Sequence, residues 1–159
     1  MNIRIGQGID FHRLEDGLEL WLGGVKVPSE KGCVAHSDGD VLLHAICDAL
    51  LGAAGLRDIG HYFPDNDPAY RKIDSKLLLE RTVAEITKYG FSIINIDSTI
   101  CLERPRVAPH IAAMKEAIGR SASISPENIS VKATTSEKMG FTGRGEGVFA
   151  VASVLLEKA

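Results

Sequence analysis

The hydrophobic residues of this chain follow two different repeats, and the switch between them limits the chain to folds that combine strands with helices. Ile94, Ile96 and Ile100 alternate with polar residues, which is the repeat of a half-buried strand. Leu42 and Ile46 lie one helical turn apart in a segment that keeps this spacing, which predicts a helix. The sequence therefore predicts the α+β class.

Expected elements follow one another along the whole sequence, with no linker, repeat or low-complexity segment between them. Strands are expected at 3–9, 18–22, 25–27, 94–102, 129–133 and 148–156, and helices after 40 to about 54, at about 74–89 and from 109 onward. Gly23-Gly24 is a hairpin signal. Ser37, three residues before Asp40, resembles a capping box, and Gly90 is the expected C-cap of the second helix. We predict one domain, residues 1–159, with a mixed or antiparallel sheet covered on one face by about three helices.

Composition narrows the class of partner. Of the 159 residues, 45% are hydrophobic and 25% charged, enough apolar material for a core. The net charge of -3 argues against nucleic acid or an anionic membrane, although a small anionic substrate stays possible. Three dispersed cysteines, Cys33, Cys47 and Cys101, favour a reducing compartment. With no signal-like N-terminus and no apolar run of membrane-spanning length, a cytoplasmic location is expected.

Asp10, His12 and His44 form the candidate metal site. Asp10 and His12 are two apart on an extended segment, so their side chains leave the same face. His44 falls near the start of the first predicted helix. One carboxylate and two imidazoles, with a fourth position open, match a catalytic zinc site.

Two alternatives stay open from spacing alone. Asp10 could cap a turn while both histidines are ordinary polar residues, since D-x-H pairs are common. The same ligand types also hold iron in non-haem oxygenases, although those sites usually present H-x-D with the last histidine on a late strand.

Three further segments could handle phosphate or a polyol. The segment 134–138, Thr-Thr-Ser-Glu-Lys, offers hydroxyls, turn amides and a lysine, or else is a polar turn. The acidic segment 58–67 could bind hydroxyl groups or form a tight loop, and 104–106 could meet a nucleotide phosphate or be a solvated charge pair. The Gly-rich loop 140–147 lacks the ending of a P-loop, and Gly6-Gln7-Gly8 lacks the third glycine of a dinucleotide fingerprint.

Together these segments resemble the 2-C-methyl-D-erythritol 2,4-cyclodiphosphate synthase family of the non-mevalonate isoprenoid pathway. The resemblance covers essentially the whole chain, and the block ending Gly140-Phe141-Thr142-Gly143-Arg144-Gly145-Glu146-Gly147 is its most specific motif. The other matching motifs are 4–12, 35–40 with His44, 58–60, 63–65, 105–106 with 109–110, and 132–147.

The resemblance implies a metal-dependent phosphorus–oxygen lyase that works as a homotrimer with sites between subunits. The substrate would be 4-diphosphocytidyl-2-C-methyl-D-erythritol 2-phosphate, whose 2-phosphate attacks the β-phosphorus and releases CMP. Asp10, His12 and His44 would hold Zn²⁺, and Glu137 would contribute to a second cation, Mg²⁺ or Mn²⁺. Such a reaction needs positioning and charge neutralisation rather than an enzyme nucleophile.

The resemblance also implies roles for other residues. His36 and Thr135 would stabilise the transition state, and Ser37 would place the erythritol phosphate. The remaining substrate contacts would come from Asp58, Ile59, Gly60, Phe63, Pro64, Asp65, Asn66 and Asp67 at the methylerythritol; from Leu102, Glu103, Arg104, Pro105, Arg106, Val107, Ala108, Ala133, Thr134 and Ser136 at the cytidine and its phosphate; and from Phe141 and Arg144.

Three positions depart from the family pattern. Ser136 stands where threonine is common and keeps the hydroxyl, and Arg106 replaces a frequent lysine with a different geometry. Glu103 adds an acid beside the implied nucleotide pocket.

Two other functions remain alternatives. A metal-dependent phosphohydrolase would need a general base near the metal, for which Asp38 or Asp65 could serve. A metal-stabilised trimer could instead bind a nucleotide or isoprenoid phosphate as a sensor without catalysis.

Overall fold

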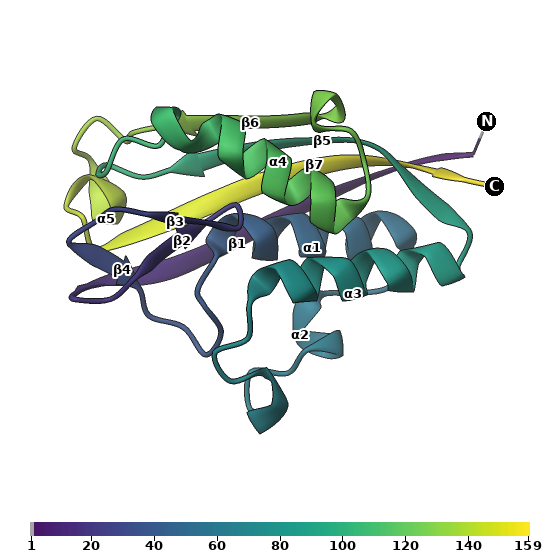
Figure 1. Cartoon of the computed structure of the whole chain (residues 1–159), viewed down its shortest axis with the longest axis horizontal. Helices are drawn as coiled ribbons and strands as arrows, with labels where there is room; N and C mark the ends of the chain where they lie inside the picture. The colour runs from purple at the N-terminus through teal and green to yellow at the C-terminus, as the bar shows by residue number, and fades with distance from the viewer. Residues whose placement is uncertain (1) are drawn as a thin grey trace.

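The computed structural model describes residues 2–159 and is built on one five-stranded mixed sheet in the order β4-β1-β7-β5-β6 (Figure 1). Its strands are β1 (Ile3–Asp16), β4 (Lys31–Cys33), β5 (Phe91–Cys101), β6 (Ile129–Thr134) and β7 (Gly147–Lys158). All neighbouring pairs are antiparallel except β5 and β6, which are parallel. A separate hairpin pairs β2 (Leu20–Leu22) with β3 (Val25–Val27).

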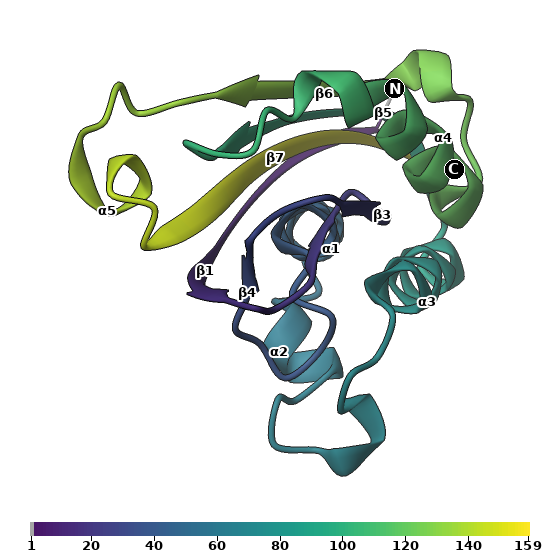
Figure 2. The same ribbon diagram turned by 60° about the vertical axis from the view of Figure 1, so that its left-hand side comes forward.

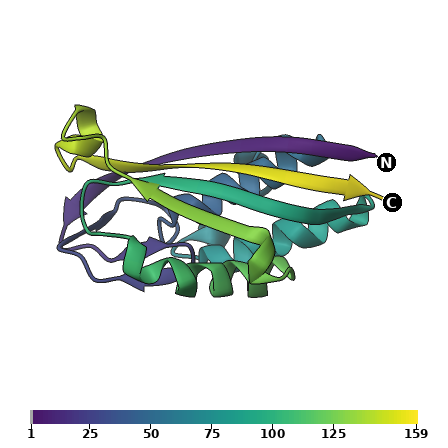
Figure 3. The same cartoon turned by 90° about the horizontal axis from the view of Figure 1, so that it is seen from above.

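Three long helices cover one face of this sheet, as the sequence predicts. They are α1 (Val41–Ala54), α3 (Ser75–Lys88) and α4 (Ile111–Ala122), and Figures 2 and 3 show them on the same side of the strands. Shorter helical segments are α2 (Ile59–Tyr62), α5 (Gly140–Gly143) and 3-10 turns at Pro68–Tyr70, Ala108–His110 and Pro126–Asn128. The core lies between the sheet and these helices, and the α+β prediction is confirmed.

The alternation of side chains along β1 gives the sheet two different faces. Asp10 and His12 share the helix-covered side with the glycines of this strand, so their side chains turn toward α1. On the opposite side, Ile5, Ile9 and Phe11 are 77%, 51% and 53% exposed. This face of the sheet therefore carries exposed apolar side chains that are uncovered within a single chain.

The backbone of α1 lies directly on β1 because Gly6 and Gly8 have no side chains. A Cβ on Gly6 would come within 2.0 Å of the Ala49 carbonyl oxygen, and one on Gly8 within 2.0 Å of the Ala45 carbonyl oxygen. Only glycine permits this approach. The contact brings the first turns of α1 over Asp10 and His12, the polar residues on the helix-covered side of β1.

Several local predictions need correction. The first helix is capped by Asp40 rather than through Ser37: the Asp40 carboxylate accepts the N–H groups of Leu43, Gly23 and Gly24. That carboxylate thereby also ties the β2–β3 hairpin to α1.

Other element boundaries also differ from the prediction. β1 runs to Asp16 instead of ending at residue 9, because residues 10–13 continue to pair with β7 and residues 14–16 pair with β4. Tyr89 is the C-cap of α3, and Gly90 follows it in the left-handed conformation. The Gly-rich loop contains the short helix α5.

None of the helices in the described part of the chain is long and apolar enough to cross a membrane. The three cysteines are buried with free thiols.

Replacing Gly8 by alanine should destabilise the protein by on the order of 3 kcal/mol, because the new Cβ overpacks the contact between β1 and α1. The matched control is Gly52→Ala inside α1, where the nearest atom outside the helix backbone, Gln7 O, would be 4.0 Å away. That substitution should be neutral or stabilise by up to about 1 kcal/mol. Urea unfolding measures both, and equal effects would contradict the assigned contact.

Candidate metal centre and substrate cavities

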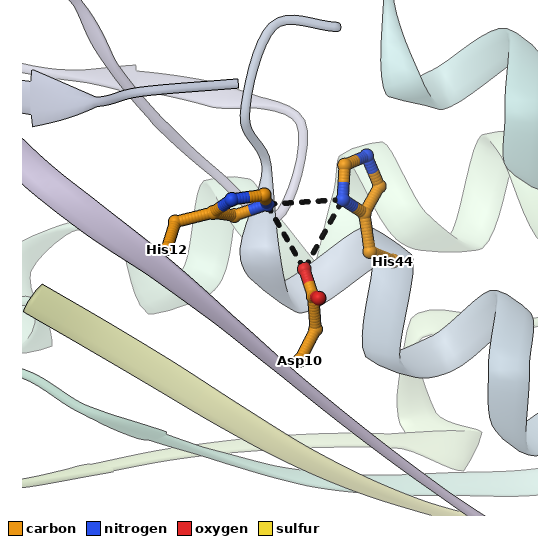
Figure 4. Close-up of side chains that lie close together, drawn as sticks. All are labelled: Asp10, His12 and His44. Carbon is orange, nitrogen blue, oxygen red and sulfur yellow. Dashed lines mark hydrogen bonds and ion pairs between the residues drawn. The ribbon is translucent and has the colours of Figure 1, made fainter. Parts of the chain in front are cut away.

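Three side chains from two elements converge at one point. Asp10 and His12 extend from β1 and His44 from the first turn of α1 (Figure 4). Asp10 Oδ2 lies 3.0 Å from His12 Nε2 and 3.2 Å from His44 Nδ1, and the two nitrogens are 3.2 Å apart. Among residues 2–159 these three form the one group of His, Cys, Asp and Glu side chains arranged to hold a metal ion.

The spacing of these atoms fits a small divalent cation. Nitrogen and oxygen ligands bind Zn²⁺ at about 2.0–2.1 Å in tetrahedral geometry, which places neighbouring ligand atoms about 3.3 Å apart. The observed separations of 3.0–3.2 Å require only a slight expansion. The residues present therefore fit a metal, and the predicted triad is brought together.

The charges of the triad stabilise one another. Burial alone would raise the pKa of Asp10, but hydrogen bonds from His12 and His44 and their charges outweigh it, so this pKa lies far below its usual value. Burial would lower the pKa of His44, but the hydrogen bond to Asp10 and the charges of Asp10, Asp40 and Asp38 raise it. The site thus attracts positive charge.

A cavity of about 640 Å³ opens beside the triad. The predicted residues His36 and Ser37 line it, together with a group from the acidic segment: Ile59, Gly60, Phe63, Pro64, Asp65 and Asn66. Tyr70 and Ile73 also line it, although no local pattern in the sequence marks either residue. The structure therefore places the triad and most residues of the acidic segment around one cavity.

Hydrogen bonds hold the acidic segment in place. Asp48 of α1 accepts the N–H of Ile59 at 2.7 Å, and Asp58 caps α2 by accepting the N–H of His61 at 3.0 Å. His36 Nε2 lies 3.1 Å from the carbonyl oxygen of Asp67. Asp58 and Asp67 thus shape this cavity without being among its lining residues.

A second cavity, of about 890 Å³, is lined by another group of the predicted site residues. Its lining includes the predicted residues Glu103, Arg104, Pro105, Arg106, Thr135 and Arg144. Lys31, which the sequence analysis missed, also lines it and donates to the Gly145 carbonyl at 3.1 Å. The basic residues suit an anionic ligand.

Other predicted nucleotide contacts lie around this second cavity. Leu102 and Val107 are buried in the core, so their side chains are not available to a ligand. One carboxylate oxygen of Glu103 is buried without a hydrogen-bond partner. Ala108 begins a 3-10 turn, and Ala133 and Thr134 end β6.

The segment after β6 adopts an unusual backbone. Glu137 and Lys138 have positive φ angles of 55° and 64°, and Thr135 Oγ1 donates to Glu137 Oε1 at 3.1 Å. Ser136 is held by its bond to the Met139 carbonyl. Glu137 lines neither cavity described above and is not part of the triad.

Phe141 belongs to the uncovered face of the sheet rather than to either cavity. Its ring centre lies 6.0 Å from that of Phe11 and 6.2 Å from that of Phe149. Arg144 donates to Glu146 at 2.8 and 3.2 Å.

Comparison with known proteins identifies relatives over the full length. The model of the YgbB family matches residues 3–157. The 2-C-methyl-D-erythritol 2,4-cyclodiphosphate synthase of Bacteroides thetaiotaomicron is 55% identical over 158 residues, 99% of each chain.

Solved structures agree with this similarity. The bifunctional IspDF of Campylobacter jejuni superposes with a TM-score of 0.96 at 40% identity over 99% of this chain. This chain spans 43% of that bifunctional protein's length. A 2C-methyl-D-erythritol-2,4-cyclodiphosphate synthase in its CDP-bound form superposes with a TM-score of 0.89 at 39% identity, covering 97% of this chain and 100% of the other.

The low pKa of Asp10 predicts a specific pH dependence of stability in metal-free protein. Its folded pKa lies below the unfolded value of about 3.9, so the ionised carboxylate stabilises the fold above that pH and the contribution is lost as pH falls. Its partner His44 has a raised pKa, so the charged imidazole contributes below that pKa and not above it.

We therefore expect the difference in unfolding free energy between the wild type and Asp10→Asn to be largest between about pH 4 and the raised pKa of His44. Urea titrations in the presence of a chelator measure it. A difference that is constant across the acid range would show that the carboxylate charge does not stabilise the fold.

Proposed function

This chain belongs to the YgbB family, and from that premise we propose that it is a 2-C-methyl-D-erythritol 2,4-cyclodiphosphate synthase of isoprenoid biosynthesis. Its substrate would be 4-diphosphocytidyl-2-C-methyl-D-erythritol 2-phosphate and its products the cyclic diphosphate and CMP. The observation that carries the proposal is the convergence of Asp10, His12 and His44 beside a cavity, in a chain 55% identical to a synthase of that name.

In the proposed reaction, the main task of the protein is to position a single substrate molecule. An oxygen of the 2-phosphate forms a bond to the β-phosphorus, the bond from that phosphorus to the CMP oxygen breaks, and its electron pair leaves with CMP. Both reacting groups belong to one molecule, so orientation can supply roughly 7–11 kcal/mol of the barrier reduction. Ser37 and His36 lie at the wall of the first cavity, where Ser37 would place the erythritol phosphate and His36 would stabilise the transition state.

Asp10, His12 and His44 would hold Zn²⁺, which offsets the repulsion between phosphates and polarises phosphorus. Glu137 is proposed to contribute to a second cation, Mg²⁺ or Mn²⁺, and its carboxylate lies on the exposed segment after β6. Thr135, hydrogen-bonded to Glu137, is proposed to stabilise the transition state.

The proposed nucleotide subsite is the second cavity. Arg104, Arg106 and Lys31 give it positive charge for the cytidine diphosphate, and the unpartnered oxygen of Glu103 would accept from a donor such as an amino group. Ala133, Thr134, Ser136 and the backbone of 102–108 would enclose the remainder. The CDP-bound relative supports a nucleotide ligand.

We propose a homotrimer because, within one chain, the residues implied for the active site line two separate cavities. The cavity with His36 and the cavity with Thr135 share no lining residue, so one substrate would span them where two chains meet. The exposed apolar side chains on the uncovered face of the sheet, Ile5, Ile9 and Phe11, support association of copies, since such groups often mark interfaces. The compartment proposed is the cytoplasm, which suits three free thiols.

Hydrolysis by solvent water is a weaker candidate. Asp38, one possible general base, already accepts the backbone N–H groups of Asp40 at 3.0 Å and Ser75 at 2.8 Å. It therefore belongs to the framework of the site, and only Asp65 remains at the cavity wall.

Phosphorus NMR of the purified protein with the cytidyl diphosphate substrate, Zn²⁺ and Mg²⁺ tests the proposed reaction. CMP and a cyclic diphosphate are expected in equal amounts, and His44→Ala should abolish both by removing a metal ligand. His36→Ala removes a proposed transition-state contact and should lower kcat by about 10²–10³-fold. Free phosphate or a linear diphosphate would instead establish hydrolysis.

Mixing subunits tests the shared site. His36→Ala and Thr135→Ala affect different cavities, so trimers that contain both variants would have some sites with two intact halves. Co-refolding the two weakly active variants should restore part of the wild-type activity. Mass spectrometry would confirm that the trimers contain both variants. If such mixed trimers recovered no activity, both residues would act in a site formed by a single chain.

A further inference from the structure

The nitrogen of His44 that faces away from the triad is held by a second set of groups. His44 Nε2 lies 2.9 Å from Ser75 Oγ and 3.2 Å from Ser37 Oγ. Ser75 is the first residue of α3 and is fully buried, so packing fixes its position. Neither the sequence motifs nor the proposed reaction gives Ser75 a role.

Asp38 determines where the Ser75 hydroxyl points. Ser75 Oγ donates to Asp38 Oδ1 at 2.5 Å, and the Ser75 N–H donates to Asp38 Oδ2 at 2.8 Å. The N–H of Asp40 donates to the same Oδ1 at 3.0 Å. A hydroxyl has one proton to donate, and here that proton is directed at the carboxylate. Ser75 Oγ therefore turns a lone pair toward His44.

A lone pair at this position requires a proton on His44 Nε2. The Nε2–H donates to Ser75, while in the metal-free protein Nδ1 donates to Asp10. A bound metal ion would replace the Nδ1 proton, so that Nδ1, the nitrogen that faces Asp10 and His12, offers the lone pair and Nε2 keeps its proton. Ser37 does not decide the tautomer, because its hydroxyl, which accepts the N–H of Gly39 at 3.2 Å, keeps its own proton free to turn toward or away from the ring.

We propose that Ser75, oriented by Asp38, is a positioning residue that fixes the tautomer and ring orientation of His44 for metal binding through Nδ1. The proposal rests on the zinc site of the proposed function and adds a buried support to it. Such hydrogen bonds behind a ligand orient it and raise its basicity. They also tie the metal ligand on α1 to the start of α3, two elements far apart in the sequence.

Zinc affinity, measured by competition with a chromogenic chelator, tests the proposal on the whole protein. Ser75→Ala should weaken zinc binding by roughly 10–100-fold, the usual effect of losing such a partner. Ser37→Ala is the matched control, since it removes a hydroxyl near the same nitrogen and should change the affinity by less than about 3-fold. Equal affinities for Ser75→Ala and wild type would overturn the proposal.

A second measurement needs no substitution. In zinc-loaded wild-type protein labelled with ¹⁵N-histidine, the Nε2 proton of His44 should give a slowly exchanging signal, and the nitrogen shifts should show coordination through Nδ1. Coordination through Nε2, or fast exchange of that proton, would refute the role of Ser75 while leaving the zinc site intact. Failure of the wild type to bind zinc would instead overturn the proposed function.

Discussion

The contact between α1 and two glycines of β1 is the constraint on which the rest of this structure depends. Without side chains at Gly6 and Gly8, the helix backbone lies against the strand, and His44 on the first turn of the helix meets the next polar positions of that strand. A larger separation would leave Asp10 and His12 with no third ligand. The same helix supports the neighbouring cavity wall through Asp48 and its bond to Ile59.

Around this contact, two carboxylates, the buried Asp40 and the half-buried Asp38, give the site its rigidity. Asp40 joins the start of α1 to the β2–β3 hairpin, and Asp38 joins the same loop to the start of α3. Both carboxylates accept backbone N–H groups, so the loop that carries His36 and Ser37 is fixed from two sides. A rigid cavity of this kind suits the proposed intramolecular reaction, in which catalysis would consist largely of holding two phosphates of one substrate in place.

The sequence predicted the class of fold and two metal ligands from repeats alone: a spacing of two places Asp10 and His12 on one face of a strand. His44 was grouped with them for its place near the start of a predicted helix, and the family resemblance implies the same triad, but spacing alone does not reveal which helix crosses which strand. The role of Gly6 and Gly8 was not predictable for the same reason. Ser75 gave no local signal either, since an ordinary serine after a capping aspartate marks only a helix start.

X-ray diffraction from crystals of the zinc-loaded protein, with anomalous data at the zinc absorption edge, is the most direct test of a preformed metal site beneath α1. We expect one strong peak per chain between Asp10 Oδ2, His12 Nε2 and His44 Nδ1, with β1 and α1 in the same relative position as in metal-free crystals. A peak elsewhere, or a triad that assembles only through movement of α1 away from Gly6 and Gly8, would contradict it.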